Sequence, residues 1–180
     1  MHRRTALLLG AAAAVSACGG PQVAAIPLGP DGRPLPGLYA IDAEEARRIP
    51  FRALDAVNAL RAGAGAAPLS LDSSLSAAAE THARDMALQN RPWHFGSDGS
   101  SPIDRARRAG FGGRLLGEAI AETYETEIET IAAWMEEPGP RAVILDPQAR
   151  RMGFGWFQED GGKIWWTMNV GTEAGGFVLS

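Results

Sequence analysis

The spacing of apolar residues predicts helices over the first two thirds of the chain. A helical pattern begins shortly before Pro50, which we expect to interrupt it, and resumes over residues 51–62. Within that range Leu54, Val57 and Leu60 fall on one stripe, and the glycines that follow are typical of a helix end. We therefore expect an amphipathic helix here with one buried face.

A longer helix is predicted between Asp72 and Asn90. Asp72 is a favourable N-cap, because its side chain can accept a hydrogen bond from the first turn. Apolar or weakly polar residues then recur at helical spacing on a single face, namely Leu75, Ala79, His82 and Met86. On this face we interpret His82 as a buried structural histidine with a satisfied hydrogen bond, not as a ligand.

Two more helices are expected, at residues 102–109 and 125–136. In the longer one we expect Ile128, Ile131 and Met135 to form the buried side. Glu125, Glu129 and Glu136 are expected to lie in water. In the shorter helix alanine alternates with arginine. We interpret the arginines as a solvated face, namely Arg105, Arg107 and Arg108.

The last third of the chain predicts strands. Residues 152–157 and 163–170 are rich in aromatic and β-branched residues, and the polar, glycine-containing turn between them is typical of a hairpin. Residues 115–121 predict a third strand. Since side chains alternate along a strand, Trp165 and Trp166 should lie on opposite faces of the sheet. Helices followed by an antiparallel sheet predict an α+β fold.

The first residues of the chain predict export. A short basic start precedes an apolar run over residues 6–15, which is too short to span a bilayer and is typical of a signal peptide. Small residues lead directly into Cys18, and this resembles the bacterial lipobox. We expect residues 1–17 to be a lipoprotein signal peptide and Cys18 to become a lipidated N-terminus that anchors the protein to the membrane. Because Gly19 is not acidic, we expect the outer membrane, with the domain facing the periplasm.

The rest of the chain divides into a tether, one domain and a tail. Residues 18–40 are rich in proline and glycine and predict a tether. Residues 41–175 are expected to form the domain, and residues 176–180 a C-terminal tail. Loss of residues 1–17 takes the net charge from −4 to −6, which argues against nucleic acid as a partner. A single cysteine excludes an internal disulfide and a cysteine-rich zinc site.

An ordered series of short motifs runs through the domain. It comprises Asn58-Ala59-Leu60-Arg61, His82-Ala83-Arg84-Asp85-Met86, His94-Phe95-Gly96-Ser97-Asp98-Gly99, Arg105, Gly117-Glu118-Ala119-Ile120, Trp134 to Arg141, Met152-Gly153-Phe154-Gly155 and Trp165-Trp166-Thr167-Met168. This series resembles the CAP superfamily, or SCP domain (cysteine-rich secretory proteins, antigen 5 and pathogenesis-related 1), in its short bacterial form. The resemblance covers roughly residues 50–171. It implies an α-β-α sandwich with a small antiparallel sheet between helices.

The resemblance also implies a cleft that members of the family often line with two histidines and two carboxylates, sometimes around a divalent metal. His94 matches the first histidine, Glu118 one carboxylate and Glu137 the other, whereas Pro140 occupies the place of the second histidine. Three such ligands and a water could still hold zinc. The alternative is a hydrogen-bonded pair of His94 and Glu118 that organises the cleft without any required cofactor.

Three functions stay open from the sequence, and the third of them is a purely structural spacer, which a cleft filled by its own side chains would indicate. The first is a membrane-anchored, extracytoplasmic, non-catalytic module that binds a lipid, a glycan or a protein in the cell envelope. The second is a metal-dependent or carboxylate-dependent hydrolase that uses His94, Glu118 and Glu137. Trp93 is expected to line the same cleft, because an aromatic ring beside polar groups suits contacts with sugars or lipids.

Overall fold

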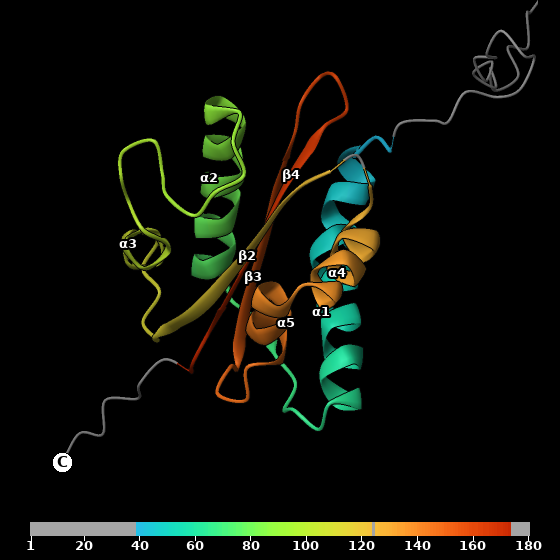
Figure 1. Ribbon diagram of the computed structural model, residues 1–180, viewed down its shortest axis with the longest axis vertical. Helices are drawn as coiled ribbons and strands as arrows, with labels where there is room; N and C mark the ends of the chain where they lie inside the picture. Colours follow the sequence, from blue (N-terminus) through green and yellow to red (C-terminus); the bar gives the residue numbers. More distant parts are fainter. Residues whose placement is uncertain (1–38, 124, 174–180) are drawn as a thin grey trace, which may run out of the picture. The chain divides into compact units, whose positions relative to one another are not determined.

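The computed structural model describes residues 39–123 and 125–173; the predicted signal peptide, Cys18, the tether up to residue 38 and the tail lie outside them. The described part is a mixed α and β fold, as predicted (Figure 1). Its four strands form one sheet in the order β1-β3-β4-β2. Their bounds are β1 Ser70–Leu71, β2 Leu115–Thr123, β3 Arg151–Gln158 and β4 Ile164–Gly171.

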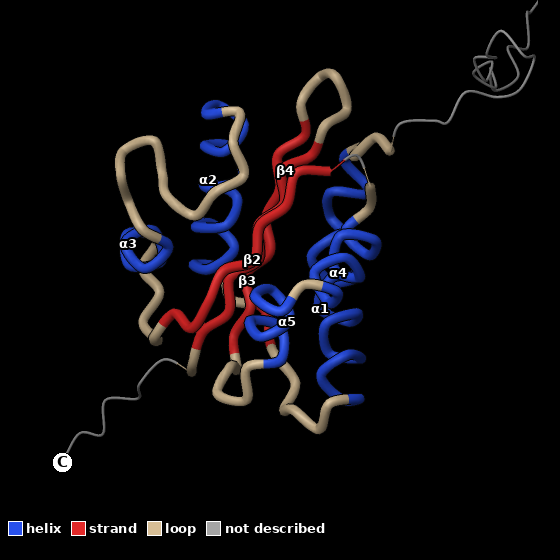
Figure 2. The backbone as a smooth tube through the Cα atoms, viewed as in Figure 1, coloured by secondary structure: helices blue, strands red, loops and turns tan. Residues whose placement is uncertain are grey.

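Helices cover both faces of this sheet (Figure 2). On one face lies α2 (Ser73–Gln89), with α3 (Pro102–Arg108) beside it. The other face carries the three remaining helices, α1 (Ala43–Gly63), α4 (Glu127–Glu136) and α5 (Pro138–Leu145). This is the α-β-α arrangement that the motif series implies. Among the described residues, no helix combines the length and the apolar character that crossing a bilayer requires.

The strand pairing confirms the predicted hairpin and the third strand. β4 pairs antiparallel with β3 on one side and with β2 on the other. The short strand β1, which the sequence did not reveal, runs parallel to β3 and pairs only with Arg151 and Met152. Trp165 and Trp166 are fully buried in separate clusters, one with Ala83 of α2 and one with the larger core. The predicted alternation is therefore correct.

Helix α2 begins and ends where the sequence predicts. The Asp72 side chain accepts a hydrogen bond from the Leu75 N–H at 2.9 Å, and Asn90 ends the helix in the left-handed conformation (φ 48°). Two glycines of β3 let this helix lie directly on the sheet. A Cβ added at Gly153 would be 2.1 Å from the Leu75 carbonyl carbon, and one at Gly155 would be 2.3 Å from the Glu80 nitrogen. Side chains at these two positions would force α2 away.

Pro50 does not interrupt the first helix, which was a wrong prediction. It lies inside α1, where Ile49, Ala53 and Val57 form a fully buried stripe. The free energy gained by burying this stripe exceeds the cost of the backbone hydrogen bond that a proline removes.

The face of α4 also differs from the prediction. Ile128 leaves 44% of its surface exposed, whereas Glu127 is buried. The reason is an ion pair, because Arg52 of α1 lies 2.7 Å from Glu127 and compensates its charge. Helix α5 was not predicted, because the sequence from Pro138 carries two prolines and a glycine within its first turn.

The folded part includes at least one residue that the sequence assigns to the tether. Tyr39 packs against the main core, and its carbonyl accepts a hydrogen bond from the Gln158 side chain at 2.6 Å. Burial, reinforced by the negative charge of Glu127, raises the pKa of Tyr39 to about 12. The chain is therefore already fixed on the end of β3 two residues before the predicted domain boundary.

Candidate functional site

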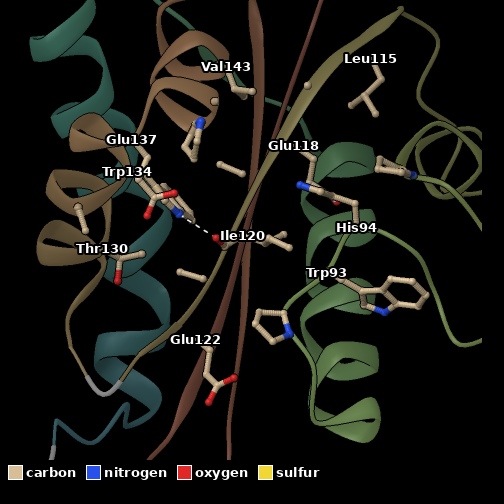
Figure 3. A pocket seen from close by; sticks show the side chains of 18 of the residues that line it. Trp93, His94, Leu115, Glu118, Ile120, Glu122, Thr130, Trp134, Glu137 and Val143 are labelled. Atoms are coloured by element: carbon tan, nitrogen blue, oxygen red, sulfur yellow. Dashed lines mark hydrogen bonds and ion pairs between the residues drawn. The ribbon is translucent and has the colours of Figure 1, made fainter.

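A cavity of about 1120 Å³ lies along β2, between the loop that follows α2 and the helices α4 and α5 (Figure 3). All four predicted cleft residues contribute to its lining, namely Trp93, His94, Glu118 and Glu137. Most of the remaining lining is apolar and comes from β2, α3, α4 and α5, including Ile103, Leu116, Ile120 and Val143. The structure thus brings the predicted residues to one hollow that reaches solvent.

His94 and Glu118 form the predicted pair. His94 Nδ1 lies 2.9 Å from Glu118 Oε1; the histidine side chain is 51% exposed, whereas the carboxylate is 2% exposed. An ionised carboxylate can only accept, so Nδ1 donates the hydrogen in this bond. The ring is thereby oriented, and its other nitrogen, Nε2, is left to bond a ligand.

Arg105 is the site residue that the sequence analysis missed. It is buried, not solvated as predicted, and its Nη2 lies 3.0 Å from Oε1 and 2.8 Å from Oε2 of Glu118. The same guanidinium donates to the carbonyls of His94 and Ser100, both at 3.0 Å. The buried Arg105 guanidinium therefore bonds both the Glu118 carboxylate and the backbone carbonyl of His94, the residue that donates to this carboxylate.

The local sequence explains why Arg105 points inward. Ser101 and Asp104 form a capping box that begins α3, and this fixes the phase of the short helix. Arg105 then falls on the buried side with Ala106, while Arg107 and Arg108 are exposed as expected. The one sequence signal for a buried Arg105 was that it belongs to the motif series. The alternation of alanine and arginine around it indicated a solvated face instead.

His82 is fully buried, as predicted, and it lies next to the same carboxylate, but its hydrogen bonding is only partly satisfied, because its Nδ1 has no hydrogen-bond partner among the described residues. Its Nε2 is 2.9 Å from the Trp93 carbonyl oxygen and 3.7 Å from Glu118 Oε1. Burial lowers the pKa of His82 even though the negative charge of Glu118 opposes this. We therefore treat His82 as neutral at pH 7, bonded to the loop that carries Trp93 and His94.

Hydrogen bonds preset the loop that follows His94. Asp85 of α2 accepts from the Ser97 N–H at 2.7 Å and from its hydroxyl at 2.6 Å. Asp98 accepts from the Ser100 N–H at 2.9 Å and pairs with Arg108 at 2.6 Å. Hydrogen bonds from the side chain and the N–H of Ser100, together with the Arg108 guanidinium, lower the pKa of Asp98. These contacts fix the polar turn beside the cavity.

Trp93 is held in place at the mouth of the cavity. Its indole N–H donates to the Gln89 side chain at 2.9 Å, and the Arg91 guanidinium lies 4.0 Å from the centre of its ring. The Phe95 ring follows at 5.6 Å. An aromatic group fixed in this way offers a rigid surface to a ligand.

The geometry does not bring the three predicted metal ligands together. Glu137 lies across the cavity, at the junction of α4 and α5, close in sequence to Pro140. Within residues 39–123 and 125–173, no three His, Cys, Asp or Glu side chains lie close enough to hold one metal ion. Arg105 moreover occupies both oxygens of Glu118. The residues present do not fit a zinc site built from His94, Glu118 and Glu137.

Comparisons with known proteins agree with the motif series. Residues 54–170 match the model of the cysteine-rich secretory protein (CAP) family. The chain is 32% identical over 120 residues to the protein YkwD of Bacillus subtilis. This match covers 67% of the chain and 46% of YkwD. The chain thus spans about half the length of this curated relative.

Solved structures share the fold. An extracellular protein of Bacillus anthracis that contains an SCP domain superposes with a TM-score of 0.65 at 23% identity, covering 82% of this chain and 45% of its own. An outer surface protein of Borrelia burgdorferi superposes with a TM-score of 0.64 at 17% identity, covering 76% of this chain and 98% of its own. At these identities the likeness extends to the fold alone.

Proposed function

Because the chain belongs to the CAP family, we propose that it is a non-catalytic binding module of the bacterial cell envelope, and that the cavity along β2 is its binding site. The observation that carries this proposal is the state of Glu118. A buried carboxylate that Arg105 bonds through both oxygens is neutralised, and it is therefore a poor nucleophile, proton acceptor or metal ligand.

The lining supports a ligand with one polar group and a longer apolar part. The polar group would bond to His94, the half-exposed side chain of the charged network. The apolar part would lie along β2, against Leu116, Ile120 and Val143. A lipid or an envelope glycan with an apolar face meets this description, and so does a protein segment of mixed character.

Calorimetry with two probes tests the proposal. Palmitate represents the lipid class and tetra-N-acetylchitotetraose the glycan class. We expect one of them to bind, and His94→Ala and Trp93→Ala each to weaken it at least tenfold, or about 1.4 kcal/mol. Leu88→Ala, which changes an exposed residue of α2 outside the cavity, is the matched control. Binding that His94→Ala leaves unchanged would contradict this assignment of the site.

A hydrolase in the same cavity is the second candidate function. One observation favours it: a buried carboxylate orients His94 through Nδ1, which is how a general base is commonly positioned. Zinc titration separates a metal-dependent form of this hydrolase from the binding module. Micromolar zinc binding that is lost in His94→Ala would favour that enzyme, whereas no binding at millimolar zinc would favour the binder.

We further propose that a lipid on Cys18 holds the domain on the membrane, in the outer membrane facing the periplasm. The small residues before Cys18 and the proline-rich and glycine-rich stretch after it support this. Cys18→Ser should leave the protein unacylated and release it into the soluble periplasmic fraction. Continued attachment to membranes would contradict the lipid anchor.

A further inference from the structure

The hydrogen-bond partners of His94 determine which of its two ring nitrogens carries the hydrogen. Nδ1 lies 2.9 Å from Glu118 Oε1. Arg105 bonds both oxygens of this carboxylate, and because a guanidinium is always charged, Glu118 is its ionised partner and can only accept. A neutral His94 therefore carries its hydrogen on Nδ1. The other ring nitrogen, Nε2, is then a hydrogen-bond acceptor and cannot donate.

His82, the second histidine beside this carboxylate, has the opposite arrangement. Its Nε2 lies 2.9 Å from the Trp93 carbonyl oxygen, and a carbonyl oxygen can only accept. In a neutral His82 the hydrogen is therefore on Nε2, and Nδ1 is bare. The two rings thus differ in tautomer, so His82 is an internal reference for any measurement that reads the tautomer of His94.

The charged side chains of the cavity also favour a ligand that donates hydrogen bonds. Among the described residues that line the cavity, none is a lysine or an arginine, and three are glutamates. Arg105 compensates Glu118, and Lys163 lies 3.2 Å from Glu122. Glu137 is exposed, and although it is the N-cap residue of α5, its side chain makes no capping hydrogen bond. Its carboxylate is therefore a second acceptor, across the cavity from the histidine (Figure 3).

We propose that the ligand of this cavity is an uncharged glycan, which donates hydroxyl or amide hydrogens to His94 Nε2 and to the Glu137 carboxylate. This rests on the binding function proposed above. Two acceptors on opposite walls call for a ligand with donors at separate positions, and the hydroxyl groups around sugar rings supply them. The C–H faces of the rings would lie against Trp93 and the apolar side chains of β2.

The same chemistry disfavours the other ligand classes. A carboxylate or a phosphate has no hydrogen to donate to His94 Nε2, and the negative charge of Glu137 would repel it. A long-chain alcohol supplies a single donor for two acceptors. An organic cation would lose its hydration in a cavity whose described lining offers one uncompensated carboxylate among mostly apolar groups.

Nuclear magnetic resonance of the ¹⁵N-labelled full chain carrying Cys18→Ser reads the tautomers directly. At pH 8, above the ordinary histidine pKa of about 6.5, long-range ¹H–¹⁵N spectra distinguish a ring nitrogen that carries hydrogen from one that does not. We expect the hydrogen on Nδ1 in His94 and on Nε2 in His82, and His94→Ala assigns the signals. A hydrogen on Nε2 of His94 would overturn the proposal and leave the binding function standing.

Calorimetry at the same pH compares three probes. They are neutral tetra-N-acetylchitotetraose, tetragalacturonate, which has as many rings but a carboxylate on each, and palmitate. We expect the neutral glycan to bind at least tenfold more tightly than either anion. Glu137→Lys should weaken the neutral glycan and strengthen tetragalacturonate, because a cationic donor replaces the acceptor. Glu136→Lys makes the same change of charge at an exposed neighbour outside the lining and is the matched control.

The outcomes separate this proposal from the binding function on which it rests. If palmitate or tetragalacturonate binds as tightly as the neutral glycan, and His94→Ala removes that binding, the choice of ligand is overturned and the binding module stands. Equal effects of Glu137→Lys and Glu136→Lys would overturn the role of Glu137. Absence of binding by all three probes would contradict both proposals.

Discussion

The two outer edges of the sheet are built on opposite principles. Along β2, a network of charged groups is buried behind the cavity: Glu118 meets Arg105 and His94 within hydrogen-bond distance, and His82 lies close by. Along β3, a groove between α1 and α2 is floored by glycine and aromatic residues, and the charges of its wall, such as Glu80 and Arg84, pair with each other in water. One edge depends on buried polar side chains and the other on the close approach of α2 to the glycines of β3.

This difference separates positions where a substitution should destabilise the domain strongly from positions where it should not. A buried ion network is costly to disturb, because removal of one charge leaves another without compensation. An exposed side chain on the wall of the groove, such as Phe51 at 62% exposure, costs little to alter, because water already surrounds it. Substitutions at the two edges should therefore differ most in their effect on the free energy of unfolding.

The largest effect is expected from Arg105→Met. The change leaves the buried Glu118 carboxylate without its cation, and the free energy of unfolding should fall by about 3–5 kcal/mol in urea denaturation. The double variant Arg105→Met with Glu118→Gln should recover most of this loss, since the amide carries no charge. A loss below about 1 kcal/mol in the single variant would contradict the role given to Arg105. Phe51→Ala at the other edge should cost less than Arg105→Met.

The next effect tests how closely α2 lies on β3. Gly155→Ala would place a Cβ 2.3 Å from the Glu80 nitrogen and 2.7 Å from the Ala79 carbonyl carbon, and backbone atoms cannot easily yield. We expect a loss of about 1–3 kcal/mol in the free energy of unfolding, measured by urea denaturation. Gly161→Ala, whose Cβ would meet nothing within 4 Å, is the control and should change little. Equal stability of both variants would show that α2 can shift.

The sequence predicts those elements whose ends are fixed by local chemistry. Asp72 and Asn90 cap α2 within the chain itself, and the β3–β4 hairpin follows from alternation and its turn. Where tertiary contacts decide, prediction from the sequence fails. Pro50 remains helical because its neighbours are buried, and Ile128 turns outward because Arg52 draws Glu127 inward. Neither partner is visible in the local pattern.

The same distinction applies to the candidate site. The pair of His94 and Glu118 was expected from the family resemblance, because each residue belongs to a motif of several residues. Arg105 is a single residue within the series, and its neighbours Arg107 and Arg108 are indeed solvated. Its burial depends on a helix phase that the Ser101 cap sets and on a carboxylate 13 positions away. No local spacing reveals such a contact.

Acid should affect the β2 edge through His82. Since burial lowers its pKa in the folded state, the unfolded chain binds a proton near pH 6.5 that the folded chain does not. Stability should therefore fall as the pH drops below about 6.5, by at most about 1.4 kcal/mol per pH unit for this one group. Urea denaturation at pH 7 and at pH 5 measures the slope.

His82→Asn is the comparison for this measurement, because the amide keeps a polar side chain but does not titrate. The slope between pH 7 and 5 should be smaller in the variant, whatever its absolute stability. Asp98 should not contribute to the slope between pH 7 and pH 5, because its lowered pKa keeps its carboxylate ionised over this range. An unchanged slope would mean that the pKa of His82 is the same in the folded and unfolded chains, and it would contradict the effect of burial.

The smallest expected effect compares two arginines that lie over aromatic rings. Near the cavity, Arg91 lies 4.0 Å from the centre of the Trp93 ring; on the other side, Arg84 lies 5.4 Å from that of Phe157 and also pairs with Glu80. Because the indole is the better partner and the contact is closer, Arg91→Ala should cost about 0.5–1 kcal/mol and Arg84→Ala less than that. Thermal denaturation of both variants measures the difference, with Arg91→Lys retaining part of the contact. A larger loss in Arg84→Ala than in Arg91→Ala would contradict the stronger contact that we assign to Arg91 and Trp93.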